Sequence, residues 1–106
     1  LKGTPTSRGY YRGKVRLVHD TSDFNRIERG DVLVIPYSDV AWTPLFAKAG
    51  AVISESGGVL SHSSIIAREY GIPAVVSVRS ALSILREGEY VLVDGYTGKI
   101  TVESCV

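Results

Sequence analysis

Short apolar runs separated by helix signals constrain the fold of this chain most strongly. Val32–Ile35 and Ala51–Ile53 are continuous apolar runs, and Ala74–Val78 is nearly so. A short run of this kind indicates a strand that is buried on both faces. Strands and short helices therefore alternate through the middle of the chain, which predicts an α/β fold.

Three short helices are predicted between and after these strands. The first is capped by Thr43, has Pro44 at its first helical position and ends at Gly50, which we expect in the left-handed conformation. The other two are predicted over about Ser61–Tyr70 and Ser80–Arg86, and each is followed by a glycine.

Both ends of the chain are predicted to hold hairpin-like β structure. Lys14–His19 alternates polar and apolar residues, as a half-buried strand does. Near the other end, Tyr90–Val93 and Lys99–Val102 are joined by a tight turn at Asp94–Gly98. The stretch Gly3–Gly9 is rich in turn formers and is expected to be a loop and a plausible hinge. We therefore expect a mixed sheet with β structure on a second face.

Length and composition bound the class of protein. The 106 residues suffice for one domain over 1–106, and 44% apolar with 22% charged residues is ordinary for a soluble globular fold. The net charge of +1 is spread evenly, which disfavours nucleic acid as a partner. No apolar run is long enough to cross a bilayer, and no signal-peptide pattern opens the sequence.

Cys105 is the only cysteine and forms no internal disulfide, so we expect a cytoplasmic setting. The start at Leu1 suggests a fragment of a longer polypeptide, although tag removal would leave the same start.

The segment Ser54–Val76 carries the predicted chemistry. A buried strand leads into two glycines, and His62 follows in the first turn of a helix. Helix N-termini have unpaired N–H groups and a partial positive charge, which attract anions and favour a neutral, nucleophilic imidazole. His62 is thus predicted to carry a phosphoryl-type group, although a histidine that only caps its helix would occupy the same place. The groups expected to stabilise the phosphate are Ser61, Ser63, Ser64, Gly57 and Gly58.

The chain lacks residues for a metal or nucleotide site of its own. Two histidines and one terminal cysteine fall short of the three or four ligands that a metal needs. The turn Thr97-Gly98-Lys99 does not fit the spacing of a P-loop. We therefore expect no cofactor on this domain and a phosphate donor held by another domain.

The same segment closely resembles the phosphohistidine signature of the PEP-utilising enzyme mobile domain. That family includes phosphoenolpyruvate synthase, pyruvate phosphate dikinase, enzyme I of the sugar phosphotransferase system and rifampicin phosphotransferase. The resemblance runs from Gly57 to Val76, with flanking blocks at Gly30–Val34, Trp42–Phe46 and Val93–Gly98. It implies the swivelling β/β/α fold, with a mixed sheet and short helices, and phosphorylation of His62. It also implies transfer between an ATP-grasp domain, which would supply ATP and Mg, and a PEP/pyruvate-type TIM-barrel or other acceptor domain.

Individual positions both match and depart from that family. Gly57 and Gly58 match its glycines, and Arg68 matches an arginine six residues after the histidine. Arg68 lies ~9 Å along the helix axis and on another face, so we assign it to structural pairing or partner docking rather than to chemistry. Leu60 replaces a frequent threonine and Val59 a frequent arginine, which weakens assignment to the phosphoenolpyruvate synthase or dikinase branch.

Three functions remain open. The first is a phosphoryl or pyrophosphoryl carrier domain of a phosphotransferase, which is not expected to turn over alone. The second is a catalytically silent binding or regulatory module of the same fold. The third is the carrier of an antibiotic-directed phosphotransferase of the rifampicin type. The intact Gly-Gly-x-x-Ser-His segment favours a carrier over a silent module, because sequence drift is expected to alter that segment first.

Overall fold

The computed structural model describes residues 1–104, so the prediction for Cys105 lies outside the described residues. None of the helices within this range is long and apolar enough to span a membrane. The strands are β1 (Thr4–Ser7), β2 (Tyr10–Leu17), β3 (Val32–Ile35), β4 (Ala51–Ser54), β5 (Ala74–Val76), β6 (Tyr90–Asp94) and β7 (Ile100–Ser104). The α-helices are α1 (Thr43–Phe46), α2 (His62–Tyr70) and α3 (Ala81–Ile84), and the 3-10 helices are η1 (Thr21–Arg26) and η2 (Val40–Trp42).

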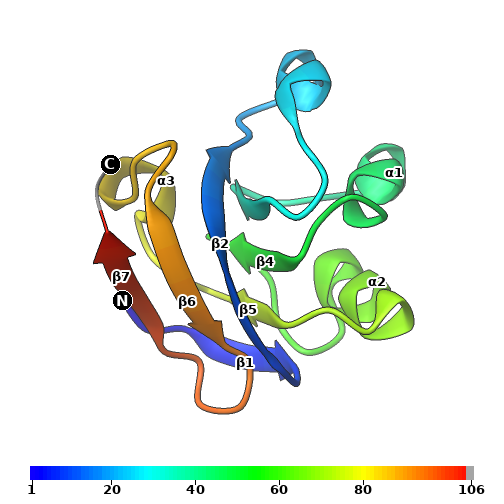
Figure 1. The fold of residues 1–106 in the computed structure, drawn as a ribbon. Helices are drawn as coiled ribbons and strands as arrows, with labels where there is room; N and C mark the ends of the chain where they lie inside the picture. Colours follow the sequence, from blue (N-terminus) through cyan, green and yellow to red (C-terminus); the bar gives the residue numbers. More distant parts are fainter. Residues whose placement is uncertain (105–106) are drawn as a thin grey trace.

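The strands form one mixed sheet in the order β1-β5-β4-β3-β2-β6-β7. Neighbours from β2 to β5 are parallel, whereas β1 with β5, β2 with β6 and β6 with β7 are antiparallel. Helices α1 and α2 lie on one side of the parallel strands, and β6, β7 and α3 lie on the other (Figure 1). The predicted α/β class and mixed sheet are therefore confirmed.

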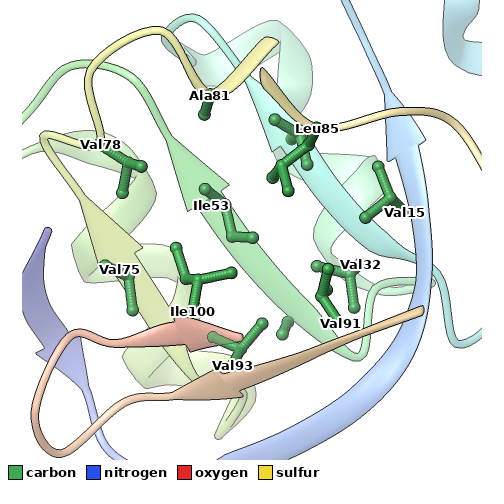
Figure 2. Close-up of a cluster of buried hydrophobic side chains, with 12 residues drawn as sticks. Val15, Val32, Ile53, Val75, Val78, Ala81, Leu85, Val91, Val93 and Ile100 are labelled. Carbon is green, nitrogen blue, oxygen red and sulfur yellow. The ribbon is translucent and has the colours of Figure 1, made fainter. Parts of the chain in front are cut away.

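The central strands are buried on both faces, as their continuous apolar sequences predict. In β3, Val32 and Val34 belong to the cluster shown in Figure 2, which lies between the parallel strands and β6, β7 and α3. Leu33 and Ile35 belong to a second cluster, beneath α1 and α2. Because successive side chains of a strand point to opposite faces, one four-residue run contributes to both clusters.

The N-terminal segment forms a strand rather than the predicted loop. Residues Thr4–Ser7 pair with β5 in antiparallel register, with an irregularity between Pro5 and Ser7. The proline sits on an edge strand, where its missing N–H is tolerated. Pairing with a partner about 70 residues away decides this structure, and local turn propensity does not.

The first helix also differs in detail from its prediction. Trp42 is the N-cap, and Thr43 is the first helical residue. Gly50 is not among the glycines with positive φ. Its lack of a side chain serves close packing instead, because an added Cβ would overlap the ring of Tyr11. The same ring lies against Gly13, and the Tyr11 hydroxyl donates a hydrogen bond to the Gly30 carbonyl over 2.7 Å.

Candidate active site

The loops that build the site follow two parallel strands and lie together at the carboxyl ends of those strands. Strands β3 and β4 are neighbours in parallel register, so the segments that follow them leave from the same edge. Hydrogen bonds join these segments: the Glu55 N–H donates to the Ile35 carbonyl over 2.9 Å, and the Ser56 hydroxyl donates to the Pro36 carbonyl over 2.7 Å. The loop after β3 therefore lies beside the glycine loop that leads into α2.

His62 is the first residue of α2, and both nitrogens of its ring face hydroxyl groups. Nδ1 lies 2.8 Å from Ser38 Oγ, and Nε2 lies 3.1 Å from Thr43 Oγ1. The ring also meets the buried ring of Phe46 edge to face, with centroids 6.0 Å apart. A neutral imidazole has one N–H and one lone pair, so one hydroxyl accepts a hydrogen bond and the other donates one. This arrangement fixes the orientation of a partly buried histidine without any ionic partner.

Sequence reasoning did not identify Ser38 and Thr43 as site residues. Thr43 was expected only to cap its helix, and Ser38 received no role. The available signal lay in the order of the strands, because loops after adjacent parallel strands meet at one edge. Thr43 also lies within the block Trp42–Phe46, which the family resemblance had marked.

The start of α2 leaves backbone donors unpaired beside the ring. Ser61 is the N-cap but makes no capping bond with its side chain, and the first helical bond runs from the Ile65 N–H to the Ser61 carbonyl. Within residues 1–104, the N–H groups of His62, Ser63 and Ser64 donate no hydrogen bond to another backbone group or to the N-cap side chain. Such a helix start is suited to an anion next to His62.

The serine hydroxyls predicted to bind phosphate are turned toward the glycine loop. Ser61 Oγ donates to the Gly58 carbonyl over 2.8 Å, and Ser64 Oγ donates to the same carbonyl over 2.7 Å. Ser63 and Ser64 are both buried, with Ser63 Oγ 3.4 Å from Ser61 Oγ. These contacts brace the loop in front of His62, and binding of phosphate by the three hydroxyls stays a prediction.

The two glycines of the loop differ in their surroundings. Gly57 has φ of +112°, and an added Cβ would lie 2.8 Å from Ser61 Oγ. Gly58 has no atom within 4 Å of such a Cβ. The positive φ therefore requires glycine at position 57. At position 58 the contribution to the loop comes from the backbone carbonyl, which accepts hydrogen bonds from the two serine hydroxyls.

Arg68 joins the glycine loop to the N-terminal strand. One guanidinium nitrogen donates to the Thr6 carbonyl over 2.8 Å, and another donates to the Val59 carbonyl over 2.7 Å. These bonds place Arg68 as a backbone clamp away from the imidazole. A role in docking a partner stays a prediction.

The site offers no set of side chains suited to holding a metal ion. Throughout the described part of the chain, no three His, Cys, Asp or Glu side chains gather as a cation site needs. The chemistry that the geometry supports is nucleophilic attack by an imidazole nitrogen, beside unpaired N–H donors.

Comparison with known proteins gives a consistent result. Residues 27–98 match the family model of the PEP-utilising enzyme mobile domain. The chain is 48% identical over 102 residues to an uncharacterized phosphotransferase, YvkC, of Bacillus subtilis, and 41% identical over 102 residues to rifampicin phosphotransferase of Bacillus cereus. It is 46% identical over 94 residues to phosphoenolpyruvate synthase of Escherichia coli. These alignments cover 96%, 96% and 86% of this chain but 12% of each relative.

Solved structures agree on the fold. A solution structure of Enzyme I aligns with a TM-score of 0.64 and 28% identity, covering 74% of this chain and 33% of that one. Aconitase X of Thermococcus kodakaraensis aligns over 98% of both chains with a TM-score of 0.78, but at 20% identity this likeness concerns the fold alone.

Proposed function

The chain belongs to the PEP-utilising enzyme mobile domain family, and from this premise we propose that it is the phosphohistidine carrier of a multidomain phosphotransferase. His62 receives a phosphoryl or pyrophosphoryl group at one site and delivers it at another. The observation that carries the proposal is the imidazole held through both nitrogens at the start of α2. A histidine that only capped its helix would not need two hydroxyls from a neighbouring segment, one in the loop after β3 and one at the start of α1.

The two ring nitrogens have different roles in this proposal. Nε2 is the nitrogen farther from the helix backbone, and its hydrogen bond to Thr43 is the longer of the two, at 3.1 Å. Ser38 Oγ lies within hydrogen-bond distance of Nδ1. We assign the tautomer in which Nδ1 donates to this oxygen, which leaves the lone pair on Nε2. Nε2 therefore attacks phosphorus, and the bond from phosphorus to the leaving oxygen breaks with its electron pair going to the donor. In the second step an acceptor oxygen attacks phosphorus, and the P–N electron pair returns to Nε2.

Other domains complete the reaction. The chain spans 12% of the length of the relatives compared above, and it has no P-loop spacing. We place ATP and Mg on an ATP-grasp-type domain and the acceptor on a PEP/pyruvate-type or rifampicin-type domain, in a cytoplasmic enzyme. The unpaired N–H groups of α2 stabilise the phosphoryl charge while the carrier moves between them.

The test is intact-mass and acid-lability analysis of the full-length protein after incubation with ATP or with phosphoenolpyruvate, beside a His62→Ala variant. An acid-labile, alkali-stable adduct that the variant lacks is expected, and its mass separates phosphoryl from pyrophosphoryl. If the folded full-length protein forms no adduct with either donor, the carrier proposal is rejected and a silent binding module takes its place.

A further inference from the structure

Exposed apolar side chains occur in both segments that meet at His62. Among the large apolar residues in the described part of the chain, Leu60 and Val40 are the most exposed, at 83% and 81%. Leu60 precedes His62 by two residues, and Val59 beside it is 55% exposed. We call Val40, Val59 and Leu60 the apolar rim.

Val40 belongs to the short segment that contacts the ring at both of its ends. Ser38 and Thr43 lie within hydrogen-bond distance of the two nitrogens of His62, and Val40 stands between them in the chain. Val59 and Leu60 stand three and two residues before His62, in the glycine loop. The rim is thus drawn from the two segments that meet at the imidazole.

The rim is held in place rather than left free to collapse onto the core. The Val59 carbonyl accepts a hydrogen bond from Arg68. Val40 begins η2, whose N-cap Asp39 accepts a hydrogen bond from the Ala41 N–H over 3.0 Å. A fixed apolar surface loses little conformational freedom when it binds, so it is suited to docking.

The charges beside the ring point to the chemistry of the partner. The segments 37–43 and 57–62 contain no lysine or arginine, and their only charged residue is Asp39. A phosphoryl donor is polyanionic, so its charge must be neutralised by cations on the partner. Apart from the contribution of Asp39, attraction between the empty carrier and that partner must then come from apolar contact.

We propose that the apolar rim docks on the mouth of the donor site, the partner surface being an apolar ring around a cationic centre that holds the donor phosphates. This inference rests on the proposed carrier function. It assigns the rim to loading because His62 carries no phosphoryl charge before loading. After loading, the anionic phosphoryl group itself attracts a cationic acceptor site, so delivery depends less on the rim.

The experiment measures single-turnover phosphorylation of His62 in the full-length protein. Leu60→Asn and Val40→Asn are each expected to slow loading from the protein's own donor about tenfold, the effect of exposing one apolar side chain that is otherwise buried on docking. Ile84→Asn is the matched control, because Ile84 is 52% exposed on α3, away from α1 and α2 (Figure 1). Loading of wild-type protein should change only modestly with salt, since Asp39 is the single charge within these two segments.

Two further measurements separate docking from chemistry. Phosphoramidate phosphorylates imidazole without a partner domain, so the rim variants should react with it at the wild-type rate, and their thermal unfolding should be unchanged. The inference is overturned if the rim variants load from the protein's own donor at the wild-type rate, or if only delivery slows. Absence of any adduct on His62 in wild-type protein would instead reject the carrier function itself.

Discussion

Removing the hydroxyls that face His62 should slow its phosphorylation without unfolding the protein. Ser38→Ala deletes the partner of Nδ1, and Thr43→Val deletes the partner of Nε2 with little change in shape. A neutral hydrogen bond contributes about 0.5–1.5 kcal/mol, so Ser38→Ala should lose about 2- to 10-fold in rate. Thr43→Val also frees the Nε2 lone pair that attacks phosphorus, so its loss of rate should be the smaller of the two. Both hydroxyls act on one ring, and either loss lets the ring turn, so the double variant should lose less than the product of the two.

The assay is single-turnover phosphorylation in the full-length protein, with ring ¹⁵N spectra recorded on the same variants. Thr43→Ser keeps the hydroxyl, so its phosphorylation rate should stay within about twofold of wild type, because at most one hydrogen bond is weakened. Ser83→Ala removes an exposed hydroxyl on α3 and should have no effect. Thermal unfolding of each variant checks that the fold is kept.

The reasoning would be refuted by wild-type rates in both single variants. Unchanged ring ¹⁵N shifts in both would also refute it, because a ring whose tautomer is set by these hydroxyls must respond to their loss. An equal loss of rate in Ser83→Ala would indicate a general effect of removing hydroxyls from the domain.

Three further predictions concern stability, each checked by thermal or denaturant unfolding. Gly57→Ala should cost about 1–3 kcal/mol because of its positive φ, whereas Gly58→Ala, with open space around it, should stay close to wild type; equal effects would contradict this. Arg68→Lys cannot reach both carbonyls and should cost about 1 kcal/mol; an unchanged midpoint would show that the clamp adds no stability. The N–H of His19, and then Arg26, hold the pKa of Asp23 below its usual value, so its contribution is present above about pH 4 and is lost as the pH falls through the folded pKa. Asp23→Asn should therefore be less stable than wild type at pH 6, with the difference shrinking as the pH falls below about 4. A difference independent of pH would oppose this.

The sequence was informative wherever burial dictated the pattern. The strand over Val32–Ile35 has the bounds of its apolar run, and the predicted helix before Gly71 begins one residue later than expected. It was uninformative where a distant partner decided the structure. Thr4–Ser7 has the composition of a loop and becomes a strand because β5 offers it an edge.

The candidate site shows the same division. His62 and its glycines stand together in the chain, so local pattern was enough to propose them. Ser38 and Thr43 lie 24 and 19 residues before the histidine, and they meet it only because β3 and β4 are parallel neighbours. A prediction of strand order would have brought them together, whereas composition could not.

The ring of Tyr11 has a consequence for how this sequence can vary among its relatives. It lies where side chains at Gly13 and Gly50 would otherwise be, 37 residues apart in the chain. Neither glycine has a positive φ, so packing and not backbone conformation excludes larger residues there. At Gly13 the Gly30 carbonyl and Val32 would also crowd an added Cβ, whereas at Gly50 the nearest atoms all belong to Tyr11. Positions 11 and 50 should therefore co-vary: relatives with a small residue in place of Tyr11 should tolerate alanine or serine at position 50. Conservation of glycine at position 50 would then record packing against one side chain, independently of phosphate chemistry.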